Sequence, residues 1–367
     1  MDNNQQLPVT GDSGFRPMNI GFYRYSFLNR GGDRVVVDYA NHLAKQGHQV
    51  TFYTCLMQTV FTIHQAITVR KLPVSNEIGF LLYPLCNQLN HDYLIFDIIH
   101  CSPFLSLRHS KSMLYFAQAD DVEYYDNFVL RAIIDLLYRR YFKKSMLSVA
   151  VSEALTNTFL SRYNASNCHT VTNGIDQQTF YSEPDSELLC AKGPRKAIFF
   201  MARGDHFRKG FDLAMKVFQK ISVDVAEVME LWVCGEALSE NSFHFPVRQF
   251  GVVDDARLRQ ILSSADIFFY PSRHEGFGLF PLEAMACGCS VVTTFAIPYA
   301  KHGENALVAR IEDCDTLAKY LLELLHNPAT CKRLGQDGMF FAQQNYSSEK
   351  SARQFEAVLA GIMKNGN

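Results

Sequence analysis

The sequence predicts an α/β fold of two doubly wound domains with a cleft between them. Short runs rich in β-branched and aromatic residues alternate with amphipathic helical stretches along most of the chain. The alternation stops over residues 176–195 and then restarts, and 367 residues are enough for two domains with substantial cores. Because such sheets bind ligands beyond the carboxyl ends of their strands, often where two domains meet, the cleft is the expected functional region.

The first predicted domain covers residues 18–175 and follows an N-terminal arm, residues 1–17. The arm is polar and lacks the basic-then-apolar order of a signal peptide. MNIGFYRYS is the first expected strand, and DRVVVDYANHLAKQG is an expected helix with Val36, Ala40 and Leu43 on one face. Further strands are expected in HQVTFYTC, YLIFDIIHCS, SMLYFAQ and MLSVAVS.

The second predicted domain covers residues 196–345 and follows a linker, residues 176–195, which holds prolines and acids without a sustained period. Its expected strands are KAIFFMAR, MELWVCG, DIFFYPS and SVVTT, and its expected helices are RKGFDLAMKVFQKI, DARLRQILSSA and LFPLEAMACG. The C-terminal segment 346–367 is predicted to be a helix that packs back on the first domain.

Composition excludes several classes of protein. A net charge of -2 gives no bulk attraction to nucleic acid, and no run of about 18 apolar residues predicts a membrane-spanning helix. The ten cysteines are scattered, mostly inside apolar segments, with no CxxC pair that would suggest zinc. We interpret them as reduced thiols, and therefore expect a cytoplasmic protein.

The stretch RHEGFGLFPLEAMACG, residues 273–288, places Glu275 and Glu283 on either side of a Gly-Phe-Gly turn that precedes a helix. The glycines allow a ligand close to the backbone, and the helix N-terminus attracts an anion. Ionised carboxylates accept hydrogen bonds from sugar hydroxyls, so the pattern fits a ligand with sugar on both sides of a diphosphate. The alternative is a first-turn acid at Glu283 and a solvated loop residue at Glu275.

Two other segments favour the interpretation that this region binds a ligand with a diphosphate. Arg203 and Lys209 follow the first strand of the second domain, where two cations would suit a diphosphate. Gly31 and Gly32 follow the first strand of the first domain and open a helix, as a backbone cradle for an anion would. The alternative for the cations is a pair of solvated surface charges.

Together these segments resemble the retaining glycosyltransferases of family 4, which have the GT-B fold of two Rossmann-like domains. The resemblance covers the chain from about residue 18. The motifs that carry it are GGDRVV, VSEAL, NGID, RGDHFRKG, HEGFGLFPLEAMACG and KHGENALV.

The resemblance implies a role for each matching residue. Glu283 would bind the ribose hydroxyls, Glu275 the hydroxyls of the donor sugar, and Arg203 with Lys209 the diphosphate leaving group. Donor contacts near the sugar, the phosphates and the base are implied for Gly31, Gly32, Gly276, Phe277, Gly278, Leu279, Gly235 and Val253. Family members generally need no metal, so we expect no metal site and no cofactor, with a UDP-, GDP- or dTDP-sugar as co-substrate.

One segment departs from the family pattern. Many members have a histidine after the strand that matches SMLYF, whereas this chain continues with AQADDVEYYD. Gln118, Asp120 or Asp121 would then occupy the acceptor side of the site. His100, at another strand end, is a further candidate for this side, or alternatively a core histidine. Asp313 and Asp315 form a DxD sequence, which helix capping explains better than metal binding.

The sequence therefore predicts a metal-independent, retaining glycosyltransferase. It would move a hexose-type sugar from a nucleotide-diphosphate sugar to a hydroxyl of a glycan or lipid-linked acceptor, in polysaccharide or cell-surface glycan biosynthesis. The alternatives are a nucleotide-sugar epimerase or hydrolase of the same fold and a catalytically silent nucleotide-sugar-binding subunit. Residues 129–147 are predicted to form a basic amphipathic helix. This helix would either contact the inner face of an anionic membrane or be an ordinary domain helix with a solvated basic face.

Overall fold

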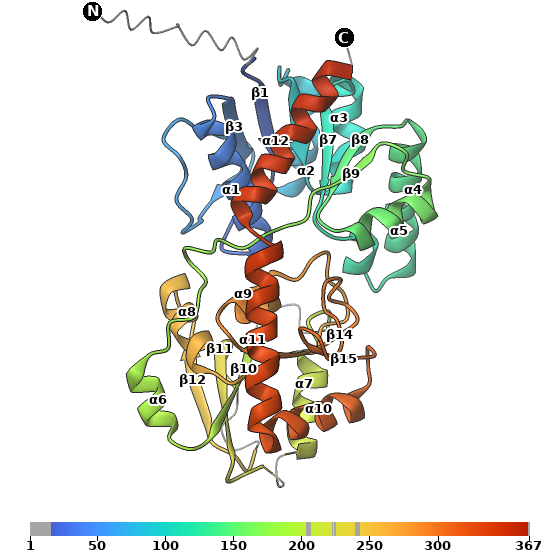
Figure 1. Ribbon diagram of the computed structural model, residues 1–367. Coiled ribbons are helices and arrows are strands. Elements are labelled where there is room, and N and C mark those ends of the chain that lie inside the picture. The colour runs from blue at the N-terminus through green and yellow to red at the C-terminus, as the bar shows by residue number, and fades with distance from the viewer. Residues whose placement is uncertain (1–15, 203–206, 222, 224, 239–242, 366–367) are drawn as a thin grey trace, which may run out of the picture.

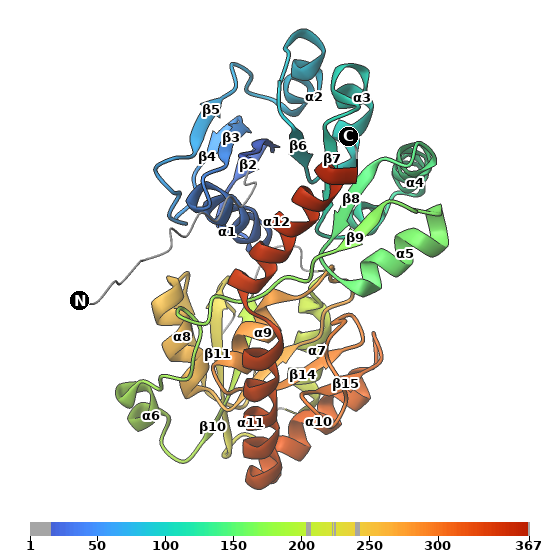
Figure 2. The same ribbon diagram turned by 45° about the horizontal axis from the view of Figure 1, so that its top comes forward.

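The protein folds into two α/β lobes stacked one on the other, with the last two helices running along both (Figures 1 and 2). The computed structural model describes residues 16–202, 207–221, 223, 225–238 and 243–365. The predicted α/β class with two Rossmann-like parallel sheets is confirmed. Among the described residues, no helix is both long and apolar enough to cross a membrane.

The first lobe is built on a parallel sheet with the strand order β5-β3-β1-β6-β7-β8-β9. Its strands are β1 (Asn19–Tyr23), β3 (Gln49–Thr54), β5 (Thr68–Lys71), β6 (Tyr93–Phe96), β7 (Met113–Ala117), β8 (Leu147–Ala150) and β9 (Cys168–Thr170). A short pair, β2 (Ser26–Phe27) with β4 (Leu56–Met57), lies beside it. The central strands β6 and β7 are apolar and buried on both faces, as parallel sheets require.

Helices cover the first sheet. They are α1 (Gly31–Lys45), α2 (Glu77–Cys86), α3 (Ser102–His109), α4 (Phe128–Lys143) and α5 (Glu153–Tyr163), with short 3-10 helices η1 (Ile99–Cys101) and η2 (Asp121–Tyr124). Most begin at a side chain that caps them: Asn76, Asn127 and Ser152 accept hydrogen bonds from the first turns of α2, α4 and α5.

The second lobe repeats the plan with the strand order β12-β11-β10-β13-β14-β15. Its strands are β10 (Lys196–Ala202), β11 (Met229–Gly235), β12 (Val247–Gly251), β13 (Ile267–Tyr270), β14 (Ser290–Thr294) and β15 (Leu307–Ala309). Its helices are α7 (Phe211–Ile221), α8 (Asp255–Ser264), α9 (Leu279–Ala286), α10 (Cys314–His326) and α11 (Pro328–Asn345). Helices α7 and α10 share one hydrophobic core cluster, whereas α8 and α9 belong to the cluster that continues into the first lobe.

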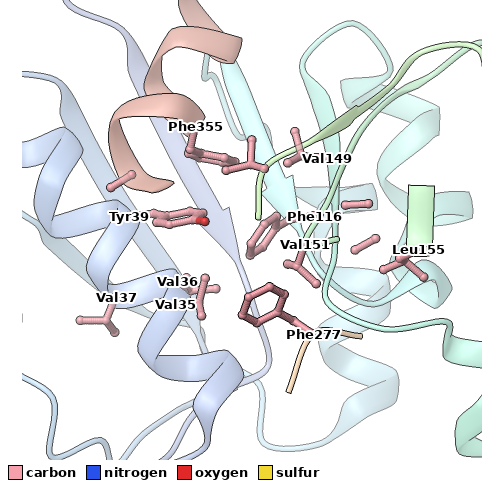
Figure 3. Packing of buried hydrophobic residues seen from close by; sticks show 14 of the residues in the cluster. Val35, Val36, Val37, Tyr39, Phe116, Val149, Val151, Leu155, Phe277 and Phe355 are labelled. Atoms are coloured by element: carbon pink, nitrogen blue, oxygen red, sulfur yellow. The ribbon is translucent and has the colours of Figure 1, made fainter. Parts of the chain in front are cut away.

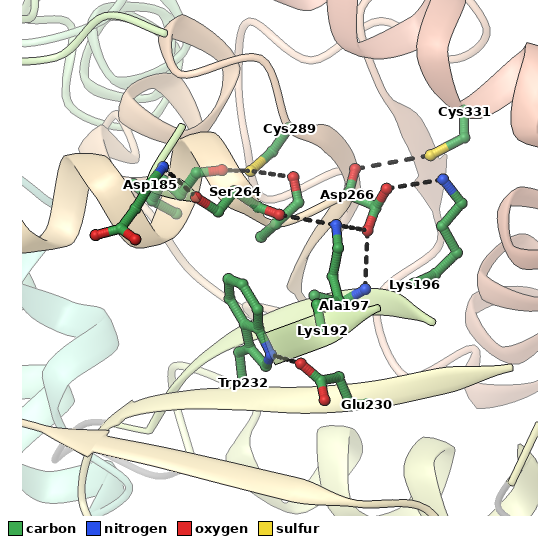
Figure 4. Close-up of polar contacts among 12 residues, drawn as sticks. Asp185, Lys192, Lys196, Ala197, Glu230, Trp232, Ser264, Asp266, Cys289 and Cys331 are labelled. Atoms are coloured by element: carbon green, nitrogen blue, oxygen red, sulfur yellow. Dashed lines mark hydrogen bonds and ion pairs between the residues drawn. The ribbon is translucent and has the colours of Figure 1, made fainter. Parts of the chain in front are cut away.

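The segment 176–195, predicted to be a linker without a sustained period, contains one short helix, α6 (Ser186–Lys192). Asp185 caps this helix, and Lys192 anchors it. The Lys192 ammonium donates to Ser264 O at 3.0 Å and to Asp266 Oδ2 at 2.8 Å, while Lys196 binds the other carboxylate oxygen of Asp266 (Figure 4). No local sequence pattern marks this lysine as buried, because its partners lie more than 70 residues away.

The chain passes between the lobes twice, and the two crossings are hydrogen-bonded to each other. Ser348 N donates to Ile175 O at 2.9 Å. Gly174 lies so close to Ser347 that a Cβ at position 174 would be 2.3 Å from its carbonyl carbon. After the second crossing, α12 (Ser348–Asn365) lies along the first lobe (Figure 1).

One hydrophobic cluster joins the lobes. Phe355 of α12 stacks on Tyr39 of α1 with ring centroids 4.8 Å apart, and Phe116 packs on Phe355. Phe277 of the second lobe points into the same cluster beneath Val36 (Figure 3). The apolar face predicted for residues 33–47 therefore packs against the last helix as well as the sheet.

Asp121 lies inside the first lobe, which its sequence position among acids did not reveal. Its Oδ2 accepts from Ile99 N at 2.8 Å and from Tyr115 OH at 3.3 Å. Burial raises the pKa of Asp121 to about 7. The folded protein thus holds a proton that the unfolded chain releases between about pH 4 and pH 7, so this group makes the free energy of unfolding fall as pH rises through that window.

We predict that Asp121→Asn removes this contribution. The slope of the unfolding free energy against pH should become less negative by up to about 1.4 kcal/mol per pH unit between pH 4 and 7. Urea unfolding at several pH values measures the slope. Asp337→Asn, at an exposed ion pair with Arg333, is the matched control and should leave the slope unchanged. An unchanged slope in Asp121→Asn would show that Asp121 is ionised in the folded protein.

Candidate active site

The loops at the topological switch points of the two sheets meet between the lobes. In each sheet the strand order reverses beside the first strand, between β1 and β6 in the first lobe and between β10 and β13 in the second. Ligands of doubly wound sheets bind beyond the carboxyl ends of the strands at such points. The loops after β1 and β13 carry the two glycine motifs that the sequence singled out, and the loop after β10 carries Lys209.

Lys209 and Glu275 form an ion pair at the switch point of the second lobe. Lys209 Nζ lies 2.7 Å from Glu275 Oε1, and the same oxygen lies 2.8 Å from Tyr270 OH and 3.0 Å from Ser272 Oγ. The carboxylate is only 8% exposed. Burial alone would raise the pKa of Glu275, but the Lys209 ammonium and these hydrogen bonds bring it below its usual value. The site therefore holds a buried carboxylate in its ionised form.

Arg273 fixes the two loops that carry this pair. Its guanidinium is 4% exposed and binds Asp212 bidentately, with Nη1–Oδ1 and Nη2–Oδ2 distances of 2.6 and 2.9 Å. Its backbone N–H donates to Arg208 O at 2.8 Å. The bidentate bonds to Asp212 raise the pKa of Arg273, which keeps the clamp charged at any physiological pH. Arg273 thereby keeps the loop that carries Lys209 beside the loop that carries Glu275.

The glycine motifs of the two lobes meet across the cleft. A Cβ on Gly31 would lie 3.2 Å from Leu279 Cδ1, and one on Gly276 would lie 1.8 Å from the carbonyl oxygen of Gln118. Ser152 Oγ donates to Gly276 O at 2.6 Å and closes the contact from the first lobe. Glycine is needed at position 276 because the backbones approach more closely than any side chain permits.

Gln118 directly follows β7, in the segment where many family members have a histidine, and its side chain lies beside the first turn of α1. A Cβ on Gly32 would lie 2.6 Å from Gln118 Oε1. Gln118 Nε2 donates to Asp97 Oδ2 at 3.2 Å, and Arg24 pairs with Asp97 and, at 2.7 Å, with the fully buried Asp33. The hydrogen bond to Asp97, which Arg24 holds in place, fixes the orientation of the Gln118 amide.

The other acceptor-side candidates have structural contacts. Asp120 caps η2 through the backbone N–H of Val122, and its second oxygen lies 3.2 Å from Arg162. His100 lies in η1, where Nε2 is 3.3 Å from Tyr125 OH, and burial lowers its pKa, which favours the neutral ring. Of the acceptor-side candidates, Gln118 is the one in contact with both glycine motifs.

The predicted donor-binding residues spread over neighbouring elements. Gly278 is the N-cap of α9 and, having no side chain, leaves the first turn of that helix without a side-chain cap. Phe277 is buried and its ring packs against Tyr299, so its side chain belongs to the core. Gly235 ends β11 with a φ of +97°, and Val253 is half-buried just before α8. Arg203 lies outside the described residues.

Glu283 lies in the middle of α9 and is buried. Its Oε1 is 3.3 Å from Nη1 of Arg34, which comes from α1 of the first lobe.

Asp313 caps α10 through the N–H of Thr316, as expected from its position. Within the described part of the chain, no three His, Cys, Asp or Glu side chains are grouped as metal ligands would be.

Comparison with known families follows the same division of the chain. The family profile described as Glycosyltransferase Family 4 matches residues 29–179, and the profile described as Glycosyl transferases group 1 matches residues 195–327. The chain belongs to glycosyltransferase family 4.

Two curated relatives illustrate the similarity of this family 4 member to named enzymes. It is 24% identical to N-acetyl-alpha-D-glucosaminyl L-malate synthase of Bacillus anthracis, over 62% of this chain and 63% of that protein. It is 26% identical to the phosphatidyl-myo-inositol mannosyltransferase of Mycolicibacterium smegmatis, over 52% of this chain and 51% of that protein. The match thus covers less than two thirds of the length of either relative.

Solved structures share the fold over nearly the whole chain. Sucrose-phosphate synthase from Thermosynechococcus elongatus superposes with a TM-score of 0.77 at 16% identity, covering 94% of this chain and 99% of that one. Anabaena HepE, solved in complex with UDP and glucose, superposes with a TM-score of 0.73 at 16% identity, covering 94% and 99%. Both similarities show the GT-B fold.

Several polar residues of the site escaped sequence reasoning. Arg24 and Asp97 directly follow β1 and β6, so their position at a switch point was a usable signal. Arg208 precedes Lys209, and its guanidinium carbon lies 4.3 Å from the ring centroid of Tyr124 in the opposite lobe. That contact joins residues more than 80 positions apart and has no local signature.

Gly276→Ala tests the contact between the lobes. The added methyl group would overlap the Gln118 carbonyl, so we expect each lobe to fold but the cleft to stay open. Small-angle scattering should give a larger radius of gyration, and turnover of any substrate held by both lobes should fall by roughly tenfold or more.

Gly361→Ala on α12 is the matched control, because a Cβ there meets nothing within 4 Å. A Gly276→Ala variant as compact and as active as the wild type would contradict the close approach of the two backbones.

Proposed function

We propose that this family 4 glycosyltransferase moves a hexose-type sugar from a nucleotide-diphosphate sugar to a hydroxyl of a glycan or lipid-linked acceptor. The observation that carries the proposal is the Lys209–Glu275 ion pair beside the meeting glycine motifs at both switch points. A buried carboxylate suits sugar hydroxyls, and an adjacent ammonium suits phosphate oxygens. The UDP and glucose bound to the HepE neighbour are consistent with such a donor.

The chemistry we propose retains the configuration of the sugar. The bond between the anomeric carbon and the diphosphate oxygen breaks, and the acceptor oxygen bonds to that carbon on the same face. The acceptor proton passes to the departing phosphate oxygen. Lys209 stabilises the charge that develops on the diphosphate, and Arg203 is proposed to join it. Preorganised cations can supply this stabilisation, so we propose that no metal ion is required.

Domain closure would complete the site. Glu275 would hold the sugar from the second lobe. Gly31 at the start of α1 and the backbone of Gln118, which contact Leu279 and Gly276, would lie beside it in the first. Because the closed lobes exclude water, hydrolysis of the donor would be slow compared with transfer. This arrangement distinguishes a transferase from an epimerase or hydrolase, neither of which requires an acceptor.

The test compares two variants with a panel of nucleotide sugars and hydroxyl acceptors in EDTA. Glu275→Ala should lower nucleotide release in the transfer reaction by on the order of 100-fold while nucleoside diphosphate binding stays within about threefold. Lys209→Ala should weaken both, because it removes the cation beside the phosphates. Glu304→Ala, at an exposed ion pair with Lys301, is the matched control.

Each rival function predicts a different outcome. Donor consumption without any acceptor indicates an epimerase or hydrolase, and donor binding with neither transfer nor hydrolysis indicates a silent binding subunit. Full transfer by either variant would refute the role assigned to that residue.

We further propose that α4 contacts an anionic membrane surface, which suits a lipid-linked acceptor and a location at the inner face. Phe128 is 80% exposed and Leu136 is 64% exposed, and the same helix carries further exposed apolar residues. Its basic residues are Arg131, Arg139, Arg140 and Lys143, with Lys144 following it. Apolar exposure combined with positive charge is the composition of interfacial helices. The name of the mannosyltransferase relative includes a phosphatidyl lipid, phosphatidyl-myo-inositol.

The double variant Phe128→Glu/Leu136→Glu should bind vesicles of phosphatidylglycerol and phosphatidylcholine at least about tenfold more weakly than wild type in a sedimentation assay. Its nucleotide binding should not change. Phe340→Glu is the control, because Phe340 is a 65% exposed phenylalanine on α11 of the other lobe. Equal vesicle binding by both variants, or none by the wild type, would leave α4 as an ordinary solvated helix.

A further inference from the structure

Arg34 links the first lobe to two acids of the second lobe. Arg34 lies in the first turn of α1. Its Nη1 is 3.3 Å from Glu283 Oε1, and its Nη2 is 2.6 Å from Asp255 Oδ1. Both partners are more than 200 positions away in the sequence. The guanidinium fork therefore spans the N-terminal region of α8 and the middle of α9 from the opposite side of the cleft.

Aromatic rings hold the guanidinium in place. Its carbon lies 5.1 Å from the ring centroid of Phe61 and 5.2 Å from that of Phe180, and the side chain is 18% exposed. Arg34 Nε is buried and makes no hydrogen bond to the described residues, so the two terminal nitrogens carry the polar interaction. A planar, stacked and forked cation of this kind is specific to arginine, because an ammonium has neither the plane nor the fork.

The two acids differ in how much they depend on Arg34. Asp255 is 40% exposed and is solvated whether or not Arg34 is present, whereas the Glu283 side chain is only 4% exposed. A buried carboxylate that loses its cation becomes costly to keep ionised. Nearby charge also depends on this arginine: burial raises the pKa of Asp38, one turn along α1, and Arg34 opposes that rise.

We propose that Arg34 is a positioning residue for the nucleoside half of the donor. It binds the Glu283 carboxylate from the first lobe and turns it so that the carboxylate accepts ribose hydroxyls. This inference rests on the proposed function, in which Glu283 binds ribose.

The inference makes nucleoside binding depend on both lobes. Lys209 and Glu275 place the phosphates and sugar within the second lobe, whereas Arg34 makes the ribose contact conditional on the first lobe being in position. Loss of Arg34 should therefore raise the donor KM more than it lowers kcat, because the interaction is present in the ground state and the transition state alike.

The experiment is a double-mutant cycle measured by calorimetry with the nucleoside diphosphate that binds the wild-type protein. We expect Arg34→Gln to weaken binding by roughly tenfold, and Arg34→Gln/Glu283→Gln to bind no more weakly than Glu283→Gln alone. Arg34→Lys should be intermediate, because an ammonium reaches one acid but not both. Asp255→Asn should weaken binding by less than about threefold, since it leaves the Glu283 contact.

Arg333→Gln removes an exposed ion pair with Asp337 and should bind like the wild type. Thermal unfolding of each variant establishes that it is folded, and Arg34→Lys decides the question should Arg34→Gln fail to fold. The donor KM and kcat are measured on the same variants, with the KM rising and kcat staying within about threefold.

Two different failures are distinguishable. If Glu283→Gln leaves nucleotide binding unchanged, the ribose role of Glu283, and with it this part of the proposed function, is wrong. If Glu283→Gln weakens binding but Arg34→Lys equals the wild type, or if the losses of Arg34→Gln and Glu283→Gln add, the proposed function stands and the role of Arg34 is overturned.

Discussion

A carboxylate buried in a closing cleft needs a cation beside it, and the Lys209–Glu275 ion pair meets that requirement here. The arrangement around it follows from this need. Arg273 clamps the two loops that carry the pair, and its own charge is balanced by Asp212. Glycine follows Glu275 because the backbone must lie against the carbonyl of Gln118. The charges, the clamp and the close backbone approach therefore form one structure at the end of β13.

A second buried carboxylate between the lobes is also paired with a cation, but here the two partners come from different lobes. Glu283 belongs to the second lobe and Arg34 to the first. Both lobes are also joined by the paired crossings at Ile175 and Ser348 and by a hydrophobic cluster that includes Phe277. Separating the lobes would thus break this ion pair while the backbone crossings stay together. Such an arrangement links the position of the lobes to the charge environment of the ligand.

Sequence reasoning was most successful where the signal is local. The alternation of strands and helices predicted both sheets, and the first turns at Gly31 and Leu279 agreed closely with the observed starts of α1 and α9. Helix α6 was missed because its seven residues are too few to show a sustained period, although Asp185 caps it locally, and because the Lys192–Asp266 contact that anchors it joins distant segments. The contacts of Arg34, Asp97 and Gln118 were missed for the same reason, since only the folded chain brings those strand ends and helices together.

The most direct test of the account is calorimetry of the wild-type protein with UDP, GDP, dTDP and their sugar conjugates in EDTA. The account predicts that one base family binds without metal and raises the melting temperature, since a ligand well above its dissociation constant stabilises the fold by a few kcal/mol. It also predicts that Lys209→Ala loses most of that binding. If no nucleotide binds even with added magnesium, the cleft is not a donor site, and the loop around Glu275 is only a turn that enters a helix.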